Sequence, residues 1–105
     1  MAKNQSLQAI RGMGDVMPEG SKNPVYDSSQ WVAVRRRFEK WAELHAYRYI
    51  ETPVIEYTEL FKRTSGETSD IVSKEMYSFE DQGGRMLSLR PEGTASVCRA
   101  IAEHG

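Results

Sequence analysis

Apolar and aromatic side chains recur every three or four residues between positions 31 and 45, which is the pattern of an amphipathic helix. At roughly 100° per residue they share about 100° of arc, and charged side chains cover the rest. Ser28 or Ser29 is a suitable N-terminal cap. The large aromatic face is expected to pack on a sheet, on a second subunit or on both, with His45 as a packing residue. The stripe consists of Trp31, Val34, Phe38 and Trp41, with Ala42 and His45 beside it.

A stretch rich in aromatic and β-branched residues runs from Tyr47 to Tyr57 and predicts a strand. Pro53 interrupts this stretch and removes a backbone donor, so the strand is expected to be an edge, bulged, or paired on one side only. Residues 58–63 predict a short helical turn. The polar residues 63–75 predict a surface loop with room for one helical turn.

Two segments of period-two alternation, 76–80 and 85–89, flank the turn residues 81–84, which end in Gly83-Gly84. Two such arms around a glycine turn predict a β-hairpin. Pro91 ends the second arm, and a last helix is predicted from Gly93 or Thr94, with Gly105 near its C-terminal cap. Its apolar positions are Ala95, Val97, Cys98, Ile101 and Ala102.

The order of helix, strand, loop, hairpin and helix predicts an α+β fold in which helices flank an antiparallel sheet. Residues 1–30 are rich in Gly, Pro, Ser, Asn and Asp, which predicts an irregular segment. It has room for a short strand at 7–10 and for turns at 11–15 and 17–20.

The composition excludes several classes of protein. The chain has 105 residues, of which 39% are apolar and 28% charged, so collagen-like and wholly disordered chains are excluded. The longest apolar run, residues 31–34, is far shorter than the about 20 residues of a membrane span, and no secretory signal pattern is visible. A net charge of −1 is low for a dedicated nucleic-acid-binding module. We interpret the basic run 35–37 as a solvated helix face, with a phosphate contact as the alternative.

The only cysteine, Cys98, excludes a disulfide within the chain and suits a reducing cytoplasm. We expect it to be a small buried residue. The two histidines, His45 and His104, lack ligand spacing, so no metal site is predicted.

The segment from Leu89 to Thr94 is the strongest candidate for a binding site, because a strand ends and a helix begins among polar side chains. The N-terminus of a helix carries free N–H groups and partial positive charge. The Glu92 carboxylate could hold a ligand ammonium and the Thr94 hydroxyl could add a second contact. A purely structural explanation is equally open: Arg90 pairs with a carboxylate, Glu92 favours the helix dipole and Thr94 caps the helix.

Several segments spread over nearly the whole chain resemble the amino-terminal part of bacterial histidyl-tRNA synthetase, a class II aminoacyl-tRNA synthetase. The combination is more specific than any one of its parts. The segments are Gln8-Ala9-Ile10-Arg11-Gly12-Met13 with Asp15, Phe61-Lys62-Arg63, residues 74–81, Leu89-Arg90-Pro91-Glu92-Gly93-Thr94-Ala95, Arg99-Ala100 and Glu103-His104-Gly105.

The resemblance implies roles for individual residues. The helix from Trp31 and the strand with Pro53 look like motif 1 of class II synthetases, which builds the dimer interface. Glu92 and Thr94 match the positions that bind the α-amino group of histidine. The turn around them would be supported by Arg90, Pro91 and Gly93, and the interface of a homodimer would include Trp31, Val34, Phe38, Trp41 and Pro53.

The resemblance also implies the reaction of the complete enzyme. With ATP and Mg2+, the family forms histidyl-adenylate and transfers histidine to tRNA(His). These synthetases are several times longer, and their motif 2, motif 3 and anticodon-binding domain lie outside this chain. We expect the chain to hold no catalytic residue and to be inactive alone. Residues 1–105 are expected to be the amino-terminal part of the catalytic domain: an irregular segment 1–27, a motif-1-like helix and strand 28–57, and a hairpin and helix 76–105.

Two alternatives come from other functional classes. The first is a non-catalytic relative, the regulatory subunit of ATP phosphoribosyltransferase, which shares the synthetase core. The intact stretch from Leu89 to Thr94 favours the enzyme over it. The second is an oligomerisation module without a ligand, which would associate through Trp31, Phe38 and Trp41.

Overall fold

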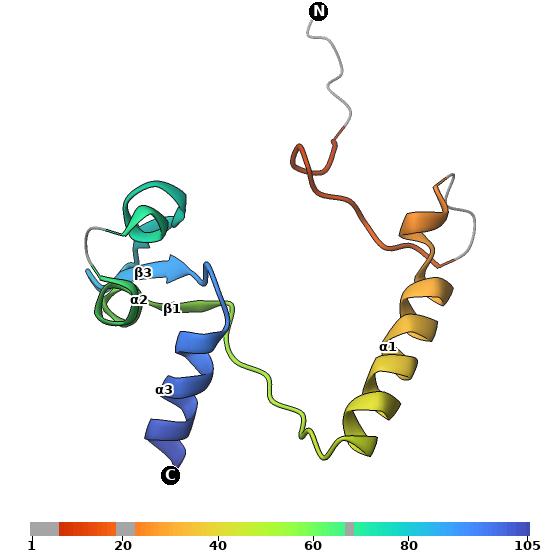
Figure 1. The fold of residues 1–105 in the computed structure, drawn as a ribbon. Helices are drawn as coiled ribbons and strands as arrows, with labels where there is room; N and C mark the ends of the chain where they lie inside the picture. The colour runs from red at the N-terminus through yellow and green to blue at the C-terminus, as the bar shows by residue number, and fades with distance from the viewer. Residues whose placement is uncertain (1–6, 19–22, 67–68) are drawn as a thin grey trace, which may run out of the picture. The chain divides into compact units, whose positions relative to one another are not determined.

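The computed structural model describes residues 7–18, 23–66 and 69–105. The chain forms two compact units, Met1–Arg48 and Tyr49–Gly105 (Figure 1). Helices and an antiparallel sheet together confirm the α+β class.

One long helix, α1 (Ser28–Leu44), dominates the first unit and follows a single 3-10 turn, η1 (Pro24–Tyr26). The predicted start is confirmed, but the predicted serine cap is wrong, because the cap is Asp27. Its Oδ1 accepts hydrogen bonds from the Ser29 N–H at 2.9 Å and the Ser29 hydroxyl at 2.7 Å. The hydroxyl bond, followed by the N–H bond, holds the pKa of Asp27 below its ordinary value.

An aromatic stack closes the C-terminal end of α1. The ring of Trp41 stacks on His45 at a centroid distance of 4.3 Å and on Tyr47 at 6.1 Å. The Trp41 carbonyl lies 2.8 Å from Nδ1 of His45. His45 is therefore a packing residue, as the sequence predicts. No residue of α1 is buried within the described chain.

In the described residues before α1, 7–18 and 23–27, the one helical element is η1, and residues 7–10 do not form the predicted strand. The backbone turns at Gly12, where φ is +87°, and the Met13 N–H donates to the Ile10 carbonyl at 2.9 Å. A strand needs a neighbour to pair with, and the pairing found in this part of the described chain is a bridge between Met17 and Asp27. Of the turn predicted at 17–20, residues 19 and 20 lie outside the described residues.

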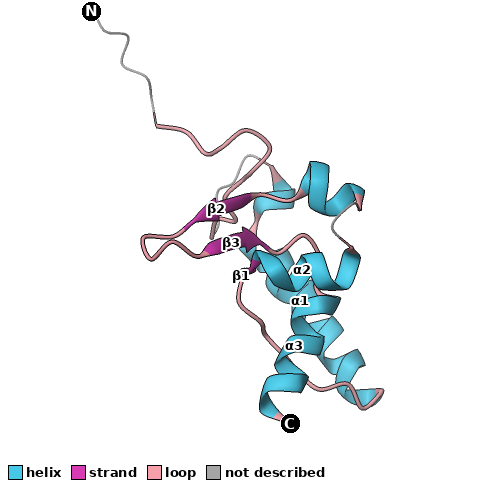
Figure 2. Ribbon diagram, turned by 90° about the vertical axis from the view of Figure 1, so that its left-hand side faces the viewer, coloured by secondary structure: helices cyan, strands magenta, loops and turns pink. Residues whose placement is uncertain are grey.

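The second unit contains a three-stranded antiparallel sheet made of β1 (Ile55–Tyr57), β2 (Ser78–Glu80) and β3 (Met86–Leu89). The strand order is β1-β3-β2, so β3 is central and pairs on both sides. Figure 2 shows β3 between its two neighbours. The predicted hairpin of residues 76–89 is confirmed, with arms slightly shorter than predicted.

Asp81 organises the hairpin turn. Its Oδ1 accepts from the N–H groups of Gly83 at 2.8 Å and Arg85 at 2.9 Å, and its Oδ2 accepts from Arg85 Nε at 2.7 Å. The Arg85 backbone N–H is the largest of the influences that hold the pKa of Asp81 below its ordinary value. Gly84 has a φ of +79°, a conformation that glycine adopts without a steric penalty.

The strand predicted from Tyr47 to Tyr57 is much shorter than expected, because only residues 55–57 pair with β3. The Arg90 N–H still bonds in register to the Val54 carbonyl, but Pro53 has no N–H to donate, and the Thr52 carbonyl accepts from the Arg90 side chain. The expectation of one-sided pairing is confirmed, since β1 lies at an edge of the described sheet.

Helices α2 (Thr58–Ser65) and α3 (Thr94–His104) complete the second unit, together with a single π-helical turn, η2 (Ile71–Glu75). α2 packs against β1, β3 and α3. The short helix predicted at 58–63 is confirmed and extends to Ser65. The final helix also has its predicted ends, with Gly93 and Gly105 as its caps.

Between the helices and the sheet lies a mainly polar layer. Phe61 and Ala95 are the buried apolar residues of the described chain, and Phe61 is fully buried. Ser88 accompanies them at full burial, and its hydroxyl lies 2.8 Å from that of Thr58 and 2.7 Å from that of Ser78. Ser78 and Glu56 flank Ser88 in the strand register, so one polar row crosses all three strands beneath the helices.

Because Phe61 is the one large apolar side chain fully buried in the described residues, its removal should destabilise the second unit strongly. We expect Phe61→Ala to cost about 3–5 kcal/mol in the free energy of unfolding, measured by urea denaturation. The matched control is Tyr77→Ala at an exposed aromatic position of the second unit, which should change the free energy by at most about 0.5 kcal/mol. Equal losses in the two variants would contradict this description of the core.

Candidate functional site

The turn between β3 and α3 is bound to the segment that precedes β1. Arg90 Nη1 donates to the Thr52 carbonyl at 2.9 Å and to the Thr52 hydroxyl at 3.0 Å. The Arg90 backbone N–H donates to the Val54 carbonyl at 2.9 Å. No ion pair of Arg90 is found among the described residues. Arg90 thus supports the turn, but through carbonyl and hydroxyl oxygens and not through the carboxylate that the structural explanation required.

Glu92 lies at the N-terminus of α3 and binds its first free amides. One carboxylate oxygen accepts from the Thr94 N–H at 2.6 Å and the other from the Ala95 N–H at 3.0 Å. Gly93 occupies the cap position, and Thr94 is already the first residue of the helix, so the prediction that Thr94 caps the helix is wrong. Each carboxylate oxygen keeps a lone pair free, so capping leaves Glu92 able to accept from a cationic ligand.

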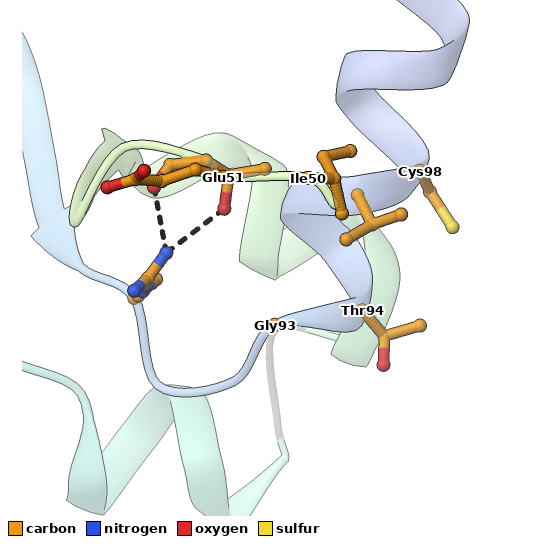
Figure 3. Close-up of a pocket in the computed structure, with 8 residues that line it drawn as sticks. Ile50, Glu51, Gly93, Thr94 and Cys98 are labelled. Carbon is orange, nitrogen blue, oxygen red and sulfur yellow. Dashed lines mark hydrogen bonds between the residues drawn. The ribbon is translucent and has the colours of Figure 1, made fainter. Parts of the chain in front are cut away.

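Beside this corner lies an open hollow of about 500 Å³ in the second unit. Figure 3 shows Thr94 and Cys98 projecting from the same side of α3, as side chains four residues apart on a helix do. Of the predicted segment 89–94, Arg90, Gly93 and Thr94 line the hollow, and Leu89, Pro91 and Glu92 do not. The lining residues are Ile50, Glu51, Thr52, Arg90, Gly93, Thr94, Val97 and Cys98.

Cys98 was expected to be buried, and this expectation is wrong: the thiol is exposed and lines the hollow. The inward face of α3 carries Ala95, Ser96 and Arg99 instead. Arg99 turns this face towards the sheet, because its guanidinium binds Glu56 of β1. The burial of Cys98 was predicted from the small and apolar residues around it. That pattern does not show which face of α3 is turned inward, because the Arg99–Glu56 contact fixes the orientation.

Sequence reasoning missed the wall of the hollow that residues 50–52 supply. Glu51 is held there by Tyr49, whose hydroxyl donates to Glu51 Oε2 at 2.5 Å. Nothing in the local pattern singles out these residues, because their place beside α3 depends on contacts with Arg90, which is 38 positions away from Thr52. The one weak signal in the sequence is that the polar residues Glu51 and Thr52 are adjacent in a strand predicted to lie at a sheet edge.

The aromatic face of α1 is the second candidate surface, and it belongs to the first unit. Four side chains of this face are between 50% and 68% exposed: Trp31, Val34, Phe38 and Trp41. Trp31, Val34 and Phe38 border an apolar hollow of about 520 Å³, where Trp31 Nε1 donates to the Val25 carbonyl at 2.5 Å. Pro53, the remaining residue of the predicted interface, is also exposed.

Within the described residues, no three His, Cys, Asp or Glu side chains gather where they could hold a metal ion. None of the helices there has the length and apolar character that crossing a membrane requires.

Comparison with known proteins assigns the family. A family model described as histidyl-tRNA synthetase matches residues 20–105. The histidine–tRNA ligase of Listeria monocytogenes is 52% identical over 98 residues, which are 93% of this chain and 21% of that relative. The structure of apo histidyl-tRNA synthetase from S. aureus matches with a TM-score of 0.71 at 36% identity, over 93% of this chain and 20% of that one.

A Bacillus halodurans structure, described as an ATP phosphoribosyltransferase regulatory subunit/histidyl-tRNA synthetase, matches with a TM-score of 0.67 at 29% identity, over 95% of this chain and 24% of that one. This chain thus spans about a fifth of the length of the Listeria ligase. The family resemblance seen in the sequence motifs is confirmed. The chain belongs to the histidyl-tRNA synthetase family.

Proposed function

We propose that this chain is part of a histidine–tRNA ligase, in which it supplies one side of the site for the amino group of histidine and part of a homodimer interface. The observation that carries the proposal is the position of Glu92 at the start of α3, beside the hollow that Thr94 lines. The family assignment supports the same role.

The chemistry of the corner suits an α-amino group. An ammonium donates up to three hydrogen bonds, and the Glu92 carboxylate and Thr94 hydroxyl are acceptors close together in sequence and space. A hydrogen bond between charged groups contributes roughly 1.5–3 kcal/mol. Arg90, Pro91 and Gly93 are proposed to hold the turn in shape. Arg90 does so through Thr52, and no ion pair of Glu92 is found in the part of the chain that the structure describes.

Adenylate formation requires ATP and Mg2+, and charge must be stabilised at the reacting phosphate. The described residues offer no cluster of metal-ligating side chains, so we assign no part of that step to them. In the complete ligase, ATP, Mg2+ and tRNA(His) are proposed to be bound by other parts of the protein. The single cysteine agrees with a cytoplasmic enzyme.

A second candidate is a non-catalytic subunit related to the ATP phosphoribosyltransferase regulator, which the match to the Bacillus halodurans structure favours. The higher identity to the Listeria ligase favours the enzyme, as do the retained Glu92 and Thr94. A downstream anticodon-binding domain in the same gene would exclude the regulatory subunit. A bare oligomerisation module rests on the exposed face of α1 alone.

The isolated chain should not activate histidine, because we propose that the groups that stabilise charge at the phosphate lie in other parts of the ligase. We expect no histidine-dependent exchange of pyrophosphate into ATP with the purified 105-residue chain. A complete ligase in which this chain occupies the matching segment serves as the positive control. Exchange above background with the pure chain would refute the assignment of catalysis to other parts of the protein.

Loss of the Glu92 carboxylate should weaken histidine binding selectively. In a complete ligase containing this chain, Glu92→Ala is expected to raise the histidine KM on the order of ten- to a hundredfold and to leave the ATP KM nearly unchanged. Pyrophosphate exchange measures both constants.

The control Glu92→Gln removes the charge and keeps one acceptor oxygen for the helix N–H groups, so it loses less of the cap than Glu92→Ala does. It should also raise the histidine KM. If Glu92→Gln binds histidine as the parent does, the proposed ammonium contact is wrong.

The exposed aromatic face of α1 should mediate association of the chain. We expect Trp41→Glu to shift the sedimentation profile towards the monomer, because a charge would be buried in an apolar interface. Arg36→Gln, on the opposite side of α1, changes the net charge by the same amount and should leave the profile unchanged. An unaltered profile for Trp41→Glu would argue against an interface at this face.

A further inference from the structure

The hollow beside α3 has two walls that come from distant parts of the sequence. Residues 50–52 form one wall, and Gly93, Thr94, Val97 and Cys98 form the other. The width of such a site depends on whatever ties the two segments together. Two arginines do so: Arg90 binds Thr52 across 38 positions, and Arg99 binds Glu56 across 43 positions.

The contact between Arg99 and Glu56 is a partly buried ion pair. Arg99 Nε lies 3.0 Å from both oxygens of Glu56, whose side chain is only 7% exposed, while that of Arg99 is 27% exposed. Arg99 Nη1 also donates to Glu103, one turn further along α3. The guanidinium is therefore fixed from both sides, and its fork geometry allows this where a single ammonium would not.

Apart from the packing of α2 on both α3 and β1, few side chains fix how α3 is rotated against β1. The buried side chains of α3 are Ala95 and Ser96, which are small, and the Ser96 hydroxyl has no hydrogen-bond partner among the described residues. Small side chains permit a helix to slide or rotate at low cost. A buried carboxylate does not, because it must keep its cation within reach.

We propose that Arg99 and Glu56 are positioning residues for the amino-acid site: they hold α3, and with it Glu92 and Thr94, at the right distance from residues 50–52. The inference rests on the proposed function, since it deepens the description of that same site. Arg99 and Glu56 do not line the hollow and act through the backbone that they join.

The test uses a complete ligase in which this chain occupies the matching segment. Arg99→Met should raise the histidine KM roughly tenfold or more, because small displacements of binding groups are costly, and should leave the ATP KM within about twofold. Arg99→Lys retains the charge and should recover part of the loss. The matched control Arg36→Met, at an exposed arginine of α1, should behave as the parent does.

A double variant separates positioning from stability. Glu56→Gln combined with Arg99→Met removes the uncompensated buried carboxylate, so it should regain thermal stability relative to Arg99→Met alone. We expect its histidine KM to stay raised. Recovery of the histidine KM along with stability would overturn the inference and leave the pair a purely structural role.

The remaining outcomes distinguish the two proposals. If the unsubstituted ligase shows no histidine-dependent pyrophosphate exchange, the proposed function fails. If that ligase is active and Arg99→Met leaves the histidine KM unchanged, the inference alone fails. If Arg99→Met is too unstable to purify, Arg99→Lys and the double variant carry the same comparison, and an unchanged histidine KM in both refutes the inference.

Discussion

The arrangement of the second unit depends on one ion pair between a strand and a helix. Glu56 enters the layer beneath the helices as a carboxylate, and removal from water is costly for any ion. Arg99 compensates that cost only while α3 keeps its guanidinium within reach of Glu56. The need to neutralise Glu56 therefore restricts the position of α3 relative to β1. The sheet register, the helix orientation and the walls of the hollow are all consistent with this requirement.

The layer between the helices and the sheet of the second unit is mainly polar, whereas small domains usually have an apolar core. Hydroxyl groups of Thr58, Ser88 and Ser78 bond to one another where aliphatic side chains would normally pack. Hydrogen bonds are directional, so they fix strand register well, but they contribute little net free energy compared with apolar burial. These hydroxyl groups therefore fix the strand register more than they contribute to the free energy of unfolding.

Periodicity predicted the elements whose pattern is local. Local patterns were sufficient to predict three features: α1 from its apolar stripe, the hairpin from its alternating arms, and the ends of α3 from a glycine at each. Periodicity could not predict a feature that depends on which of several side chains binds a given backbone group. Asp27 displaced the serines as the cap of α1, and the Arg90 side chain took the Thr52 carbonyl that a longer β1 would have used.

The candidate site was predicted only in part, for a related reason. The corner from Arg90 to Thr94 is a continuous stretch, so its residues could be recognised together. The opposite wall is formed by residues 50–52, which meet α3 through tertiary contacts that no local pattern encodes. The exposure of Cys98 was missed because the orientation of α3 is set by Arg99, and a charged residue in a helix is ordinarily assigned to the solvent side.

The cap at the start of α3 has a consequence for how a ligand would be met. A free glutamate side chain samples many rotamers, and ordering it costs up to about 2 kcal/mol of conformational entropy. The amides of Thr94 and Ala95 impose that order on Glu92 during folding. A cation that binds at this corner therefore meets a carboxylate that is already ordered. The entropy cost of ordering Glu92 is part of folding and does not weaken binding of the cation.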